Sequence, residues 1–124
     1  MVSFEELDLF DIKNTVSYEV PKYVEKRGYI YLVKNINYPE LFKLGKTTNM
    51  ATRLTSYNSG QPRAVTKLLC ISELLSDVGY VEKRLLDWLK QEVEPIQYRK
   101  EWFDVKYMAT IKEFIIEAES IYKV

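Results

Sequence analysis

Two short runs of apolar and aromatic residues, separated by a polar turn, constrain the fold of this chain more than any other feature. The first run covers Gly28–Val33 and the second covers Leu41–Gly45. β-branched and aromatic residues favour strands. The residues between the runs include Asn35, Asn37 and Pro39, which are typical of a turn. The pattern therefore predicts a β-hairpin.

The rest of the chain predicts a mixture of helices and strands. The expected helices cover residues 4–10, 49–57, 76–91 and 107–122, and the expected strands cover 65–71 and 101–105. The first helix rests on Ser3 and Glu6, which fit a capping box. Residues 11–27 show no clear periodicity and are expected to form a connecting arm, and residues 92–100, with Pro95, a loop. We therefore expect an N-terminal helix and arm over 1–27 and one domain over 28–124.

The composition excludes several kinds of site. The 124 residues contain no histidine and a single cysteine, Cys70. These counts rule out histidine-based general bases, zinc sites and internal disulfides, so any metal must be a hard cation bound by oxygen. Cys70 lies in an apolar run and is expected to be a buried thiol. No apolar stretch is long enough to span a membrane, and the acidic start is unlike a signal peptide, so a cytosolic location is expected.

The formal net charge is zero, but the charges are unevenly distributed. Residues 28–70 carry six basic residues against one acidic residue, a balance of +5. The segments on either side have balances of −2 and −3. A basic middle segment of this kind indicates a local surface that can face phosphate.

Strand alternation predicts which side chains share a face of the hairpin. Ile30 and Leu32 are expected on one face with Phe42 and Leu44, which leaves Tyr31 and Lys43 on the other. A phenol and an ammonium group on one face are consistent with a functional site. They are also consistent with a tyrosine that packs on a lysine stem.

A second signal comes from charged residues near the apolar faces of two helices. At about 100° per residue, Glu82 falls between Leu86 and Leu89 on the apolar side of its helix. Arg53 borders the apolar face of the shorter helix, beside Tyr57. A carboxylate turned inward needs a cation, a metal ion or several donors. Glu82 therefore either binds a metal or forms a structural ion pair, with Arg53 as one candidate partner.

These residues together resemble the paired motifs of the GIY-YIG nuclease superfamily. Gly28-Tyr29-Ile30-Tyr31 is separated by ten residues from Phe42-Lys43-Leu44-Gly45-Lys46-Thr47. Arg53 follows Gly45 by eight residues, and Glu82 lies on a later helix. The second motif is similar to the Tyr-Lys-Ile-Gly form of a viral and phage-associated branch. The resemblance covers about residues 28–107.

The resemblance implies a fold, a reaction and a set of site residues. The fold is α+β, with a small three-stranded antiparallel sheet flanked by helices, and the reaction is hydrolysis of DNA phosphodiester bonds with Mg²⁺ or Mn²⁺. Tyr31 would be the general base, Lys43 and Lys46 would lie around it, Arg53 would stabilise charge on the phosphate, and Glu82 would hold the metal. The residues predicted to contact DNA are Lys34, Lys46, Tyr57, Arg63 and Lys67.

Electrostatics limits this assignment, because a phenol with a pKa near 10 is a poor base at neutral pH. One cation about 6 Å away would lower that pKa by about two units at an effective dielectric near 20. Leu86 also stands where the branch usually has a histidine. The alternatives are therefore an active endonuclease, a catalytically silent module that binds nucleic acid or protein, and a domain whose Glu82–Arg53 pair is structural. A homodimer or a partner protein that supplies specificity is also expected.

Overall fold

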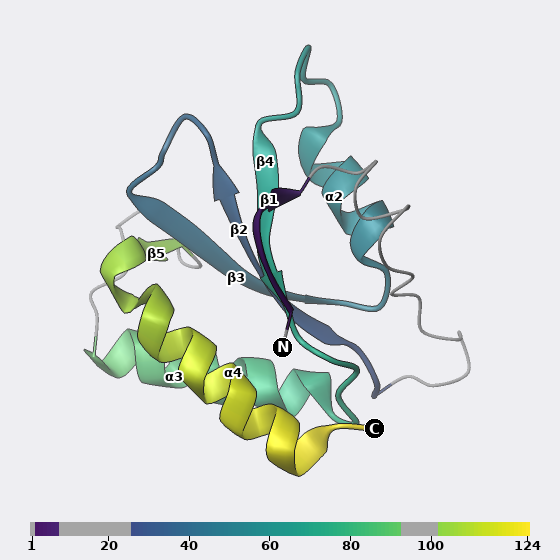
Figure 1. Cartoon of the computed structure of the whole chain (residues 1–124), viewed down its shortest axis with the longest axis vertical. Coiled ribbons are helices and arrows are strands. Elements are labelled where there is room, and N and C mark those ends of the chain that lie inside the picture. The colour runs from purple at the N-terminus through teal and green to yellow at the C-terminus, as the bar shows by residue number, and fades with distance from the viewer. Residues whose placement is uncertain (1, 8–25, 93–101) are drawn as a thin grey trace.

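A computed structural model of the chain describes residues 2–7, 26–92 and 102–124. The elements in chain order are β1 (Val2–Leu7), β2 (Tyr29–Asn35), β3 (Leu41–Thr47), α2 (Met50–Asn58), β4 (Thr66–Ile71), α3 (Val78–Glu92), β5 (Trp102–Asp104), the 3₁₀ turn η1 (Val105–Tyr107) and α4 (Met108–Tyr122) (Figure 1). The hairpin, the later strands and the three later helices lie where the sequence predicts them. Of the predicted arm over residues 11–27, only Lys26 and Arg27 lie within the described residues. Of the predicted loop over residues 92–100, only Glu92 does.

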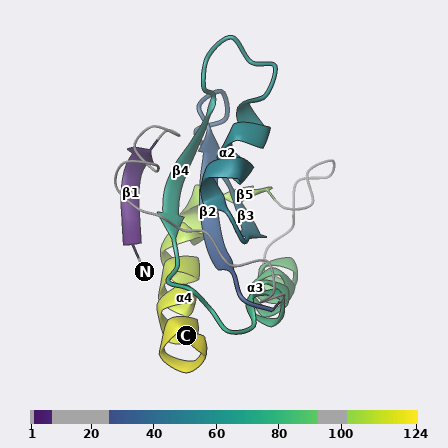
Figure 2. The ribbon, with the colours of Figure 1, turned by 90° about the vertical axis from the view of Figure 1, so that its right-hand side faces the viewer.

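The strands form one five-stranded sheet in the order β1-β4-β2-β3-β5. Every neighbouring pair is antiparallel. The expected α+β class is therefore confirmed, and the central strands β4, β2 and β3 are the three that were expected. The edge strands β1 and β5 extend the sheet on its two sides, and Figure 2 shows β1 beyond β4.

The N-terminal prediction of a helix over residues 4–10 was wrong for the part that the structure describes. Residues Val2–Leu7 form β1 and pair with β4, with Val2 opposite Ile71 and Leu7 opposite Leu68. The capping box is a local signal, whereas the free edge of β4 offers a row of backbone hydrogen-bond partners. Pairing with a distant strand overrode the local preference here.

Helices cover the two faces of the sheet unequally. The α2 helix packs on one face, where Tyr29, Tyr31 and Val33 of β2 meet Met50 and Leu54. We call this the α2 face. The α3 and α4 helices pack on the other face, the α3/α4 face, over the side chains of Ile30, Leu32, Phe42 and Leu44, which were expected to share one side. None of the described helices is long and apolar enough to cross a bilayer.

A β-bulge in β4 changes which side chains of that strand point to each face of the sheet. Leu32 pairs with Cys70 and Val33 pairs with Leu68, which leaves Leu69 as the extra residue. Leu69 and Cys70 consequently both enter the α3/α4 core, although they are consecutive. Cys70 is a buried free thiol, as expected, and burial raises its pKa to about 11.

Polar side chains fix the position of α2. Asn49 caps its start, because its side-chain oxygen accepts a hydrogen bond from the Thr52 N–H at 3.0 Å. At the other end, the Asn58 side chain accepts hydrogen bonds from the N–H groups of Val65 and Thr66, both at 2.9 Å. The helix that carries Arg53 and Tyr57 is therefore tied to β4.

Candidate active site

The centre of the candidate site is Tyr31, which lies on β2 and is 2% exposed. Its strand partner is Gly45 on β3. A Cβ atom at position 45 would lie 2.4 Å from both Cζ and Oη of Tyr31, so only glycine leaves room for the ring in this position. The second glycine of the hairpin therefore determines where the phenol lies.

Tyr57 of α2 is the direct partner of Tyr31. Their hydroxyl oxygens are 2.7 Å apart, with either able to donate, and their rings meet edge to face at 6.3 Å. Lys43 lies on the same face of the sheet, and its Nζ is 5.0 Å from the centre of the Tyr57 ring, a cation–π distance. Tyr57 was expected to contact DNA, but here it belongs to the Tyr31 cluster. The sequence signal for its place in the cluster was its position four residues after Arg53, about one helical turn further along α2.

Arg53 and Glu82 both act electrostatically on Tyr31. Burial and the hydrogen bond with Tyr57 raise the pKa of Tyr31, Glu82 raises it further, and Arg53 lowers it. The electrostatic influences on Tyr31 of β2 thus come from side chains of α2 and α3, which are distant from it in sequence. The direction of the pKa shift is opposite to the lowering that was expected from nearby cations, because desolvation of a buried phenol outweighs the effect of the exposed guanidinium.

A basic cleft of about 350 Å³ opens at the end of β3. Four basic residues line it, namely Lys26, Arg27, Lys46 and Arg53, together with Asp77. The cleft also includes Thr48, before the start of α2, and Val78 and Gly79 at the start of α3. Both helices therefore begin at the cleft, and their N-terminal dipole ends favour anions there.

Sequence reasoning missed three residues of this cleft: Lys26, Arg27 and Asp77. The first two precede Gly28 directly, so their adjacency to the predicted strand was the available signal. Lys46 reaches toward α3, because a Cβ added at Gly79 would lie 3.5 Å from its Nζ. This contact explains how a residue of β3 joins a cleft at the start of α3.

The remaining residues predicted to contact DNA do not join this site. Lys34 and Lys67 pair with each other across β2 and β4 and lie on the α3/α4 face, opposite Tyr31. Arg63 is exposed in the connection between α2 and β4. The contacts of these three residues with DNA stay predictions.

The donor set suits a hard cation with few protein ligands. Glu82 is a half-buried carboxylate that acts electrostatically on Tyr31, and carboxylate oxygens are ligands that hard cations prefer. Within the described ranges, no group of three or more His, Cys, Asp or Glu side chains could hold a metal ion. One carboxylate with several waters is a binding mode that Mg²⁺ commonly adopts.

Comparison with known proteins corrects the family that the sequence motifs indicated. A family model described as the T5orf172 domain matches residues 28–119. No GIY-YIG model matches, so the resemblance to that superfamily named the wrong family. The matching domain is phage-associated and nuclease-like. No curated protein and no solved structure matched the chain.

Proposed function

The chain belongs to the T5orf172 domain family, and from that premise we propose that it is an endonuclease that hydrolyses DNA phosphodiester bonds with a divalent cation at Glu82. The observation that carries the proposal is the hydroxyl contact of Tyr31 with Tyr57 at 2.7 Å, on the helix whose Arg53 lines the basic cleft, with Arg53 and Glu82 both acting electrostatically on Tyr31. These are groups that can orient a nucleophile, bind a phosphate and hold a metal ion. A cytosolic location, in the host cell if a phage encodes the chain, is part of the proposal.

The basic cleft supports DNA as the substrate. Its four cationic side chains outnumber its single carboxylate, that of Asp77. Contacts between cationic side chains and phosphates supply most of the sequence-independent affinity for DNA. In this proposal Lys46, Lys26 and Arg27 bind phosphates next to the scissile bond. Arg53, which lies in the cleft and also acts on Tyr31, binds the phosphate that reacts.

Glu82 is the residue that would hold Mg²⁺ or Mn²⁺. When bound, such a cation stabilises the negative charge that develops on the phosphate and on the leaving oxygen. The charge of Glu82 now raises the pKa of Tyr31, and this contribution falls when the carboxylate is paired with a cation. A cation at Glu82 would remove only this smaller cause, while burial and the hydrogen bond with Tyr57 would still raise the pKa of Tyr31.

Tyr31 and Tyr57 are proposed to orient the attacking water. Their hydroxyls share one hydrogen bond of 2.7 Å, which leaves one hydroxyl proton available to a further acceptor. Lys43 lies over the Tyr57 ring, with its Nζ 5.0 Å from the ring centre, and adds a positive charge beside the pair. In this proposal the pair positions the attacking water through that hydroxyl proton.

The test is a nicking assay on supercoiled plasmid with Mg²⁺ or Mn²⁺. Glu82→Gln keeps the shape of the side chain and removes its charge, and we expect cleavage to fall by about 100-fold or more. Asp87→Asn is the matched control, since Asp87 is an exposed carboxylate on the same helix. Equal cleavage by the Glu82→Gln and Asp87→Asn proteins would remove the role of Glu82.

The second candidate is a catalytically silent module that binds nucleic acid through the same cleft. The observation that favours it is the raised pKa of Tyr31, since a buried neutral phenol is a weak base. The same assay separates the two candidates when DNA binding is measured alongside it. Retained binding without nicking by the unmodified protein under either metal would support the module.

A further inference from the structure

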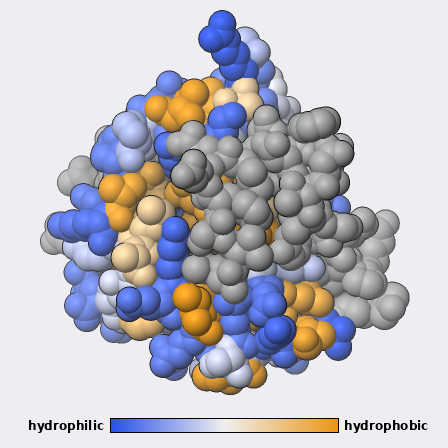
Figure 3. Space-filling view, viewed as in Figure 1, coloured by the Kyte–Doolittle hydropathy of each residue, from blue (hydrophilic) through white to orange (hydrophobic). Residues whose placement is uncertain are grey.

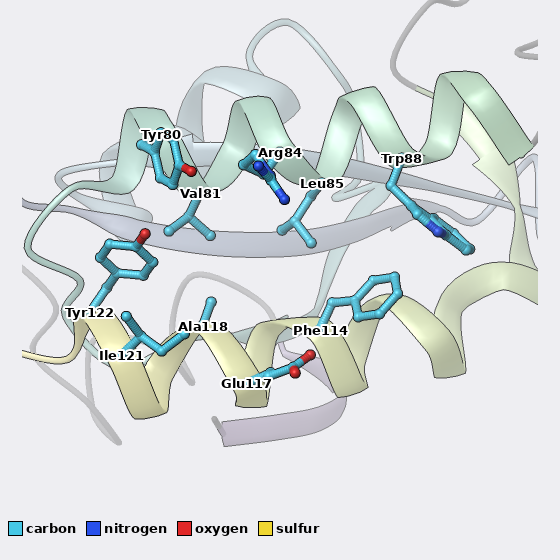
Figure 4. A pocket seen from close by; sticks show the side chains of 10 residues that line it. All are labelled: Tyr80, Val81, Arg84, Leu85, Trp88, Phe114, Glu117, Ala118, Ile121 and Tyr122. Atoms are coloured by element: carbon cyan, nitrogen blue, oxygen red, sulfur yellow. The ribbon is translucent and has the colours of Figure 1, made fainter.

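A groove of about 300 Å³ runs between α3 and α4 (Figure 4). An aromatic pair lies at each end: Tyr80 and Tyr122 with ring centres 5.8 Å apart, and Trp88 and Phe114 with ring centres 5.0 Å apart. Ile121 lines the groove with 70% of its surface exposed, and Tyr80 is 45% exposed. The groove is therefore a largely apolar surface between α3 and α4, with core residues such as Val81 and Leu85 at its base and the exposed Tyr80 and Ile121 at its rim.

Apolar exposure continues along α4. In the view of Figure 3, apolar residues form separate patches among hydrophilic ones, and several lie along the part of the surface where α4 runs in Figure 1. Single exposed apolar residues are normal, but eight of the ten residues that line the groove are apolar or aromatic, which is typical of an interaction surface. The question is then which partner the groove fits.

The charges of the groove identify the partner. Arg84 lies on the α3 wall and Glu117 on the α4 wall, and both are exposed (Figure 4). The helices run antiparallel, because Tyr80 near the start of α3 meets Tyr122 at the end of α4. Arg84 and Glu117 consequently lie at similar levels, halfway between the aromatic pairs. Walls of opposite charge make a surface that is complementary to itself.

We infer that the groove between α3 and α4 is the contact surface of a homodimer whose two-fold axis runs along the groove. This arrangement puts α3 of each copy against α4 of the other, so that Arg84 of each faces Glu117 of the other. A two-fold axis across the groove would instead put Arg84 against Arg84. Charge complementarity therefore selects the first arrangement.

The size of the surface predicts a weak dimer. A helix of 15 residues is about 22 Å long, and packed helices are about 8–10 Å apart. A face about 22 Å long and about 20 Å wide buries about 400 Å² on each copy, which lies below the range of stable protein interfaces and within that of weak, transient ones. We expect dissociation constants in the micromolar range, about 1 to 100 µM.

The dimer would leave both candidate active sites open. Glu82 and Arg84 are two residues apart on α3 and therefore point to nearly opposite sides of that helix, at about 100° per residue. The groove and the Tyr31 cluster thus lie on different flanks of α3. The dimer stands independently of the proposed nuclease function, since its test measures only association.

The test is sedimentation equilibrium of the full chain between about 5 and 500 µM. The mass should rise from 14.7 kDa toward twice that value as the concentration increases. Arg84→Glu and Glu117→Arg should each weaken association by about tenfold or more, because each places like charges together twice. A mixture of the two variants should dimerise again, because both contacts of the mixed dimer then join an acidic side chain to a basic one.

Controls keep these outcomes decisive. Lys83→Glu changes an exposed charge on α3 that does not line the groove, and it should leave association unchanged. Ile121→Glu should prevent dimerisation by a different route, and circular dichroism should show that each variant is folded. A monomer at every concentration would overturn the proposal. Dimers that survive both charge reversals, or a mixture that fails to recover, would overturn the arrangement.

Discussion

The two faces of the sheet share the same central strands but differ in what covers them. On the α3/α4 face, two helices of 15 residues enclose a cluster of 14 buried residues. On the α2 face, one helix of nine residues contributes only Met50 and Leu54 to a cluster of seven. The smaller cluster includes Tyr31, whose hydroxyl is bonded to Tyr57 rather than packed among apolar groups.

This difference assigns separate tasks to the two faces. Buried apolar area is the main source of stability, so the α3/α4 face should contribute most of the free energy of unfolding. The α2 face holds polar and charged groups in a fixed arrangement, which is what chemistry at a phosphate requires. Changes on the first face should affect stability, and changes on the second should affect activity.

The largest expected effect comes from matched leucines on the two faces. Leu89 on α3 and Leu54 on α2 are both 0% exposed, and replacing either by alanine should lower the free energy of unfolding by about 2–5 kcal/mol. Urea titrations measure this loss. Under conditions where both variants are folded, only Leu54→Ala should also lose DNA cleavage, because α2 carries Arg53 and Tyr57. Equal loss of cleavage in both variants would contradict the assignment of stability to one face and activity to the other.

A smaller effect is expected at the glycine that makes room for Tyr31. Gly45→Ala puts a Cβ 2.4 Å from a buried ring, so we expect a loss of about 1–3 kcal/mol in stability. Gly79→Ala is the control, because its nearest neighbour would be the flexible end of Lys46 at 3.5 Å. Alanine in a helix is favoured over glycine by up to about 1 kcal/mol, so this variant should be more stable. Thermal melts that rank the two variants the other way would contradict the close approach of Tyr31.

Alkaline pH should lower the stability of the protein through Tyr31, a residue of the α2 face. The pKa of Tyr31 is raised in the folded protein, while an unfolded tyrosine titrates near 10, so the folded state keeps its proton longer. The stability from this group is present below pH 10 and is lost above it, by up to about 1.4 kcal/mol per pH unit. Tyr31→Phe should flatten this decline in urea titrations between pH 8 and 11. Parallel curves for the two proteins would show that Tyr31 is not desolvated.

The smallest effect is expected at the cap of α2. Asn49→Ala removes the hydrogen bond to the Thr52 N–H and should cost about 1 kcal/mol of stability. Asn49→Asp keeps an acceptor and places a negative charge at the helix start, so it should retain stability. Denaturant midpoints for the two variants test this order. An alanine variant as stable as the aspartate variant would show that Asn58 alone holds α2 in place.

The sequence was a good guide wherever local pattern and final environment agreed. Strand alternation predicted that Tyr31 and Lys43 share a face of the sheet. The register of β2 and β3 confirms this, because Lys43 lies opposite Val33, which is on the same face as Tyr31. The helix expected over 49–57 likewise lies within one residue of its expected ends, as α2 (Met50–Asn58). These features depend on neighbours along the chain or on a short hairpin, so the information is contained in a few adjacent residues.

The sequence was a poor guide wherever distant segments decided the result. The capping box at Ser3 could not reveal that β4 has a free edge for pairing, and a run of basic residues could not reveal which face Lys34 and Lys67 would occupy. The direction of the pKa shift at Tyr31 also depends on burial, which arises only in the folded chain. The motifs indicated a nuclease, and the matching domain is nuclease-like, but they named the wrong family.

The extra residue in β4 bears on how related chains can be aligned. Leu68 and Cys70 pair with consecutive residues of β2, Val33 and Leu32, as two neighbouring residues of a regular strand would. Leu69 is the residue inserted between them. A relative that lacks one residue here can therefore keep every other strand pairing, including that of Tyr31 with Ile71. A gap at this position in an alignment would mark a straighter strand and a smaller core, and the tyrosine beside it would keep its place.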